Sequence, residues 1–173
     1  MSKLAIIVAP DPVLKRRAEP VAGVDRKVRR LMDSMLETMH AAHGIGLAAP
    51  QVGVLEQVIV VDISQPEEPP NPYCMANPEV VWRSPDLVSG EEGCLSLPEQ
   101  FGEVTRPEGV RVRYLDENGE ARELEAHGLL AKCIQHEIDH LEGVLFVDHL
   151  SSLKRNIILR RLAKAKKFSS AAE

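Results

Sequence analysis

The segment Gln-His-Glu-Ile-Asp-His at residues 135–140 constrains the fold of this chain more than any other feature. In an α-helix, residues four apart lie on the same face about 6 Å from each other, so His136 and His140 can share one divalent metal ion. Glu137 follows the first histidine and lies close enough to exchange protons with water at the metal. The segment therefore predicts a metal-binding helix and metal-assisted hydrolysis.

The sequence around this segment is typical of a helix, because apolar residues recur at helical spacing and Gly143 provides a stop signal. We therefore expect both histidines to lie on a rigid support. Two histidines that are four apart by coincidence, in the core or at the surface, are the alternative interpretation. The apolar residues of the pattern are Leu129, Leu130, Cys133, Ile134, Ile138 and Leu141.

A catalytic zinc-like ion usually has three protein ligands, so a third ligand has to come from another part of the chain. Cys133 is about 10 Å along the helix axis from His140, too far for metal bonds of about 2 Å, and is expected to line the pocket instead. Cys74 belongs to a segment that resembles a strand running into a turn, where a buried thiol packs by default. Cys94 is the better candidate, because Gly93 allows the backbone to approach the site closely.

Three short motifs follow one another along the chain. They are Gly-Ile-Gly-Leu-Ala-Ala-Pro-Gln at residues 44–51, Glu-Gly-Cys-Leu-Ser at 92–96 and Gln-His-Glu-Ile-Asp-His-Leu-Glu-Gly at 135–143. Each motif is moderately specific, and the three together are very specific. The chain therefore resembles a peptide deformylase over residues 10–148. It departs from many members of that family at Phe101, where they have arginine, and the difference concerns contacts with the distal part of the peptide substrate.

The resemblance implies an enzyme that removes the formyl group from the N-terminal formylmethionine of nascent polypeptides and releases formate. It implies that Cys94, His136 and His140 are the metal ligands. It also implies Fe(II) as the native ion, with Zn(II), Ni(II) or Co(II) as possible substitutes.

The resemblance further implies roles in catalysis and substrate binding. Glu137 would take a proton from water and return it to the departing amine. The side-chain amide of Gln51 and the backbone N–H of Leu95 would stabilise negative charge on the former formyl oxygen. Without the resemblance, Gln51 would be interpreted as an ordinary loop residue. The expected substrate-binding residues are Ile45, Gly46, Leu129 and Cys133, and core packing is the alternative for Ile45 and Leu129.

Two other classes of protein share part of the pattern. A zincin-like metallopeptidase would use His136, Glu137 and His140 but would leave Cys94 and residues 44–51 without a purpose. A structural zinc module would require a fourth protein ligand to close the coordination of the ion.

The sequence predicts a single α+β domain over residues 1–173, with antiparallel β-sheets around a central metal-binding helix and a C-terminal helix. Asn118-Gly119 between two alternating segments predicts a β-hairpin. In chain order we expect a helix from Asp25 to His43 ended by Gly44, a buried strand from Gln57 to Asp62, a proline-rich connector from Gln65 to Pro72, the hairpin strands Val110–Asp116 and Glu120–Ala126, and a short strand from Val144 to Val147.

Composition agrees with an intracellular globular enzyme. Hydrophobic residues make up 44% of the 173 residues, and no apolar run approaches the roughly 20 residues of a membrane span. The apolar residues 4–9 are too few for a signal peptide and are followed at once by Pro10. The three cysteines are an odd number and suit a reducing compartment. We therefore expect a cytoplasmic protein without membrane insertion.

The C-terminal part of the chain is strongly basic. Residues 149–172 contain seven basic and no acidic residues, whereas residues 1–148 contain 14 basic and 25 acidic residues. A helix is expected over about residues 151–168, with Ser151 or Ser152 as its cap. A solvated helix face is one interpretation, and docking to ribosomal RNA near the exit of the nascent chain, as in some relatives, is the other. Aromatic residues do not alternate with the basic ones, so sequence-specific nucleic-acid binding is not expected.

Overall fold

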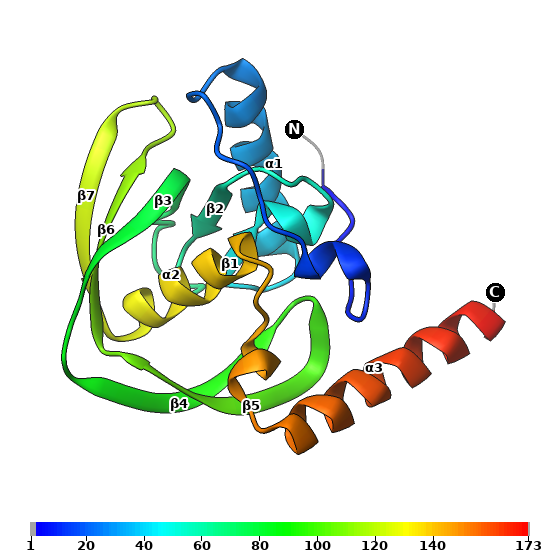
Figure 1. Ribbon diagram of the computed structural model, residues 1–173. Coiled ribbons are helices and arrows are strands. Elements are labelled where there is room, and N and C mark those ends of the chain that lie inside the picture. The colour runs from blue at the N-terminus through cyan, green and yellow to red at the C-terminus, as the bar shows by residue number, and fades with distance from the viewer. Residues whose placement is uncertain (1–2, 173) are drawn as a thin grey trace.

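The computed structural model describes residues 3–172 and has the expected α+β fold (Figure 1). Its helices are α1 (Arg26–Ala41), α2 (Gly128–Leu141) and α3 (Ser152–Ala172), with short 3-10 helices η1 (Pro12–Lys15), η2 (Ala49–Val52) and η3 (Phe146–His149). Its strands are β1 (Gly46–Ala48), β2 (Val58–Val61), β3 (Tyr73–Arg83), β4 (Leu87–Cys94), β5 (Leu97–Pro107), β6 (Gly109–Leu115) and β7 (Ala121–His127).

The strands form two antiparallel sheets. One sheet has five strands in the order β1-β2-β3-β6-β7, and the other is the hairpin of β4 and β5. Helix α2 runs across the middle of the molecule, with the five-stranded sheet on one side and the β4–β5 hairpin near it (Figure 1). This central position lets residues from both sheets reach the side chains of α2.

Strands β1 and β2 of the large sheet are covered by helices on both faces. Ile59 and Val61 of β2 belong to the apolar cluster that contains residues of α2, whereas Val58 and Val60 belong to the cluster that contains residues of α1. The separation follows from the alternation of side chains along a strand. All four side chains are fully buried, which explains why the expected strand is continuously apolar in sequence.

Helix α1 lies close to its expected position and buries the expected methionine stripe. Asp25 caps the first turn by accepting a hydrogen bond from the backbone N–H of Val28 at 2.9 Å. The expectation that Gly44 ends the helix was wrong, because the residue in the left-handed conformation is His43, with φ 59°. Gly44 is needed for another reason: a Cβ atom there would lie 2.7 Å from Cδ1 of Leu95.

The expected hairpin is confirmed as β6 and β7, with Gly119 at φ 77° in the connecting turn. The two segments pair in a continuous register from Gly109 with His127 to Leu115 with Ala121. The chain then enters α2 directly, because Gly128 adopts a positive φ of 60° immediately after β7.

The expected strand from Val144 to Val147 was wrong, because the structure has the 3-10 helix η3 there. The backbone N–H of Leu145 donates to the side chain of Asp148 at 2.9 Å, which closes a tight turn. Leu145, Phe146 and Val147 are all buried, and Phe146 stacks on His136 with ring centroids 6.4 Å apart. The apolar residues at 144–147 therefore belong to a packed turn that contacts His136.

The segment around Cys74 also differs from the expectation, because the strand does not end in a turn after it. Strand β3 continues to Arg83, and the pairing with β6 shifts between Ala76 and Glu79. Asn77 has φ 51° at this point and exchanges hydrogen bonds with the backbone of Val21. The Asn-Pro pair thus forms an irregularity within a strand.

The expected C-terminal helix is α3, which packs only through its first half. Ile158 and Leu162 are buried in a cluster with Phe146 and residues of β5. Beyond Leu162 the side chains through residue 168 are exposed, and α3 extends away from the body of the molecule (Figure 1). Within residues 3–172, no helix combines the length and apolar character that a membrane crossing requires.

Candidate metal centre and active site

Helix α2 holds His136 and His140 rigidly because its other face is part of the protein core. Ala131, Ile134 and Leu141 pack with the large sheet. The two histidines are themselves buried, with exposed fractions of 8% and 1%. The helix thus presents the two imidazoles toward the β4–β5 hairpin in fixed positions.

Cys94 is the last residue of β4, and the hairpin brings it to the two histidines. One potential ligand atom from each of Cys94, His136 and His140 lies within 4.8 Å of the others, and Sγ of Cys94 is 3.4 Å from Nε2 of His140. Metal bonds of about 2.0–2.3 Å to sulfur and nitrogen are compatible with this spacing. The structure therefore brings together the three residues that the sequence indicated as ligands.

The two histidines have different surroundings. Burial lowers the pKa of His140 and His136 lowers it further, so this imidazole is held neutral, as a metal ligand must be. The neighbours of His136 favour a positive charge. Burial alone would lower the pKa of His136, but the neighbouring Cys94, Glu92 and Glu137 outweigh it and raise the pKa. Among residues 3–172, Oε1 of Glu137 is a buried oxygen without a hydrogen-bond partner. A thiolate, two imidazoles and a nearby carboxylate therefore fit a divalent cation at this place.

Glu92 orients His136 and is in turn held by Arg106. Its Oε1 accepts a hydrogen bond from Nδ1 of His136 at 2.9 Å, which leaves Nε2 as the free ring nitrogen for a metal. Arg106 donates to both oxygens of Glu92, at 2.6 and 2.9 Å, and to Asp139 at 2.9 Å. Burial alone would raise the pKa of Glu92, but the hydrogen bonds from Arg106 and His136 lower it to about 2.

Sequence reasoning missed this network, although a signal was available. Glu92 and Cys94 are two residues apart in a strand, so both side chains lie on the same face of it. A buried acidic residue at that spacing from a proposed thiolate ligand is a candidate partner for a ligating histidine. Arg106 could not be found in this way, because it lies on the other strand of the hairpin, opposite Val88, and its side chain reaches Glu92 only in the folded protein.

Glu137 follows His136 on α2 and is buried, with an exposed fraction of 4%. Burial is the main cause that raises its pKa to about 7. Gly46 permits this position, because a Cβ atom at Gly46 would contact Oε2 of Glu137 and lie 2.7 Å from Sγ of Cys133. A carboxyl group with a pKa near neutrality is suited to proton transfer in both directions.

Gln51 is fully oriented by its neighbours. Its Oε1 accepts a hydrogen bond from the backbone N–H of Ala48 at 2.9 Å, and its Nε2 donates to Oγ of Ser96 at 3.0 Å and to Sγ of Cys94 at 3.4 Å. The amide N–H group therefore faces the proposed metal ligands. Ser96, fully buried, is another residue that sequence reasoning did not single out.

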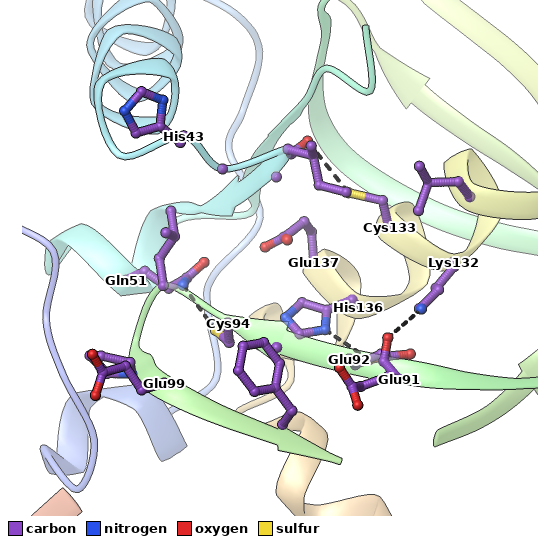
Figure 2. A pocket seen from close by; sticks show the side chains of 18 residues that line it. His43, Gln51, Glu91, Glu92, Cys94, Glu99, Lys132, Cys133, His136 and Glu137 are labelled. Carbon is purple, nitrogen blue, oxygen red and sulfur yellow. Dashed lines mark hydrogen bonds and ion pairs between the residues drawn. The ribbon is translucent and has the colours of Figure 1, made fainter. Parts of the chain in front are cut away.

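Most of the expected site residues line one cavity, which has a volume of about 500 Å³ (Figure 2), whereas His140 is not part of its lining. Ile45 and Leu129 are 40% and 46% exposed, so the alternative that both are core residues was wrong. Cys133 also lines the cavity, where its thiol donates to the backbone oxygen of Ile45 at 3.5 Å. Burial raises the pKa of Cys133. The lining includes the expected residues Ile45, Gly46, Gln51, Cys94, Leu95, Leu129, Cys133, His136 and Glu137, and also Phe101 and Lys132.

Comparison with known proteins identifies relatives over nearly the whole chain. A family described as polypeptide deformylase matches residues 3–156. A peptide deformylase from Methylocella silvestris is 56% identical, with 95% of this chain and 86% of that protein covered. A peptide deformylase from Phenylobacterium zucineum is 54% identical, with 96% and 97% covered.

Solved structures agree with these sequence relatives. The peptide deformylase from Ehrlichia chaffeensis has a TM-score of 0.92 at 40% identity, with 96% of this chain and 98% of that chain covered. The same enzyme in complex with actinonin has a TM-score of 0.91 at 43% identity, with 95% and 98% covered. This similarity distinguishes the chain from zincin-like peptidases and structural zinc modules, and the chain belongs to the peptide deformylase family.

Proposed function

We propose that Cys94, His136 and His140 hold one divalent metal ion in an active site that removes the formyl group from the N-terminal formylmethionine of nascent polypeptides and releases formate. The observation that carries the proposal is the convergence of three potential ligand atoms within 4.8 Å beside the buried carboxyl group of Glu137. The reaction itself is inferred from membership of the peptide deformylase family.

The donor set guides the choice of ion. A bound divalent ion would polarise the formyl oxygen and make a water molecule more acidic. One thiolate and two imidazoles suit Fe(II), Zn(II), Ni(II) or Co(II). We propose Fe(II) as the native ion because the chain resembles enzymes that use iron.

Glu137 is the proposed proton carrier. It takes a proton from the attacking water and returns it to the amine that leaves when the formyl C–N bond breaks. Its pKa of about 7, raised by burial, supports both steps near neutral pH. The products are formate and a free amino terminus.

Gln51 and Leu95 are proposed to stabilise the negative charge that develops on the formyl oxygen. The bond from Ala48 to Oε1 of Gln51 fixes the amide so that Nε2 faces Cys94. Leu95 follows Cys94 directly and would contribute its backbone N–H. Donors that are oriented before the reaction lose little energy to reorganisation when charge develops.

The peptide substrate is proposed to bind along β1 and to place its first side chain in the cavity. Strand β1 is at the edge of the five-stranded sheet, and an extended peptide can pair with such an edge. Ile45, Gly46, Leu129 and Cys133 would form the wall around the methionine side chain. An apolar wall suits the flexible thioether of methionine.

We further propose that the protein acts in the cytoplasm, where nascent chains emerge, and that α3 docks to the ribosome. The exposed basic residues of α3 beyond Leu162 are Lys164, Lys166 and Lys167. They support a contact with the phosphate backbone of RNA, which does not depend on base sequence.

Formate release from peptides with formylated and unformylated methionine at the amino terminus tests the function. The metal-loaded protein should release formate from the first and leave peptide bonds of both intact. Glu137→Ala should retain metal and lose at least about 100-fold in turnover, since general acid–base catalysis contributes that much. Glu142→Ala, an exposed glutamate beyond α2, is the matched control and should retain wild-type turnover. Near-normal turnover of metal-loaded Glu137→Ala would contradict the role of Glu137.

A further inference from the structure

The cavity at the active site has a second cavity beside it. This second cavity has a volume of about 270 Å³ and lies between α2 and the β4–β5 hairpin. Three residues line both cavities: Glu92, Leu129 and Lys132. Residues that line two neighbouring cavities form the wall between them.

Among these three residues, Lys132 bridges the space between α2 and β4. Its side chain starts on α2 and reaches β4, where Nζ donates to the backbone oxygen of Glu91 at 2.6 Å (Figure 2). A Cβ atom at Gly90 would lie 3.2 Å from Nζ and 3.9 Å from Cε. The end of the lysine side chain therefore lies against the backbone of β4 at Gly90, held there by one hydrogen bond, and its stem crosses from α2 to this strand.

The position of Lys132 relative to the proposed metal ligands follows from helix geometry. It precedes His136 by four residues, so both lie on the same face, about 6 Å apart along the axis. A substrate side chain that starts beside His136 and follows this face of α2 would meet the lysine stem one turn further on. A pocket for the first side chain would therefore end at Lys132.

The space behind Lys132 can accept an apolar chain. Val88, Val104 and Pro107 line the second cavity together with Leu129. Arg106 also lines it, but its donors are engaged by Glu92 and Asp139. The charge of this guanidinium is therefore compensated. Glu108 lines the cavity as well, and its carboxylate accepts hydrogen bonds from His127 and from the backbone N–H of Gly128. The side chains of Val88, Val104, Pro107 and Leu129 make the rest of this surface largely apolar.

We propose that the Lys132 side chain is the partition that limits the length of the substrate's first side chain, and that the second cavity is an extension closed by this partition. The inference rests on the proposed function. It makes Lys132 a residue that determines specificity, and unbranched apolar side chains longer than methionine are the chemical class that it excludes.

A series of formylated tripeptides tests the proposal. Their first residue is methionine, 2-aminohexanoic acid, 2-aminooctanoic acid or 2-aminodecanoic acid, and kcat/KM is expressed relative to the methionine peptide. In the wild type this ratio should fall at least about tenfold for the longest chain, which is at the lower end of pocket-based discrimination. In Lys132→Ala the ratio for the longest chain should rise by about tenfold or more. The affinity for the unformylated product peptides, measured by calorimetry without turnover, should likewise fall with chain length in the wild type and recover for the longest chain in Lys132→Ala.

Two further variants provide the controls. Lys132→Arg keeps a long stem with a hydrogen-bond donor and should retain the wild-type profile. Lys154→Ala removes an exposed lysine of α3 and should also retain it. Should Lys132→Ala not fold, Lys132→Val tests the same opening with a larger side chain.

The outcomes separate this inference from the proposed function. A wild type that hydrolyses the 2-aminodecanoyl peptide as efficiently as the methionine peptide would refute the partition, whatever the variants do. An unchanged profile in folded Lys132→Ala or Lys132→Val would refute it as well. No formate release from the formylmethionyl peptide by the metal-loaded wild type would refute the proposed function and, with it, this inference.

Discussion

At the residue scale, the three cysteines have different environments and therefore different chemistry. Cys74 is buried in the core between α1 and the sheet, and burial is the main cause that raises its pKa to about 12. Cys133 is buried and remains a thiol that donates to a backbone oxygen. Cys94 is the one that faces both histidines. A cysteine binds a metal as a thiolate, so only the third environment suits a ligand.

Cys94→Ala should therefore lose the metal and the activity. Metal analysis of anaerobically purified wild type should give about one ion per chain, with iron as the expected metal. The alanine variant should contain almost none, because two histidines alone provide too few ligands for a catalytic site.

Cys74→Ala is the matched control for this variant. It removes a buried thiol that does not line the cavity of the site and should keep both metal and turnover. Full metal content together with full activity in Cys94→Ala would remove Cys94 from the proposed site.

At the scale of elements, the site depends on the attachment of the β4–β5 hairpin to α2. Arg106 comes from β5, Glu92 from β4 and Asp139 from α2, and the guanidinium group bonds to both carboxylates. The pair of Arg106 and Glu92 is nearly inaccessible, with side-chain exposures of 8% and 3%. Since β4 carries Cys94 and α2 carries both histidines, Arg106 links the two elements on which the proposed ligands lie.

Arg106→Met should lower the free energy of unfolding by about 3–5 kcal/mol, because it leaves the buried charge of Glu92 without its partner. Urea unfolding of the wild type and the variant measures this difference. Arg111→Met is the matched control, since the ion pair of Arg111 with Glu125 is largely exposed and is expected to contribute at most about 1 kcal/mol. Equal effects of the two substitutions would show that the buried pair does not hold the elements together.

At the scale of the whole molecule, α3 combines a packing segment with a charged segment. The net charge of the chain is −5, yet residues 149–172 carry seven basic and no acidic residues. Ile158 and Leu162 are buried, so removal of all residues after Leu150 takes away core contacts together with the charges. A variant that changes charge alone separates the two roles.

The triple variant Lys164→Gln, Lys166→Gln and Lys167→Gln should turn over a small formylmethionyl peptide like the wild type but bind ribosomes more weakly. The affinity of the wild type should fall as salt rises, and the variant should depend less on salt, because it releases fewer counterions. Truncation after Leu150 should weaken ribosome binding further and also lower stability. Equal ribosome affinity of the wild type and both folded variants at low salt would refute docking through α3.

Much of the fold and the candidate site could be predicted because the signals are local. The spacing of His136 and His140, the methionine stripe of α1 and the turn at Asn118-Gly119 each lie within one element, where period and turn chemistry determine the backbone. The apolar run at residues 144–147 shows the limit of such reasoning. A short apolar run suits either a strand or a packed turn. In this protein it forms a packed turn, in which Phe146 stacks on His136.

The sequence by itself determined the helix with two histidines, the choice of Cys94 among three cysteines and the family to which the chain belongs. Only the tertiary structure decided what surrounds them: Arg106 beside Glu92, Glu92 beside His136, and Lys132 between two cavities. The physical reason is that these contacts join residues on different elements, whose separation in space depends on strand register and helix packing. A burial that raises the pKa of Glu137 to about 7 likewise exists only after the sheet and the helices have closed around it.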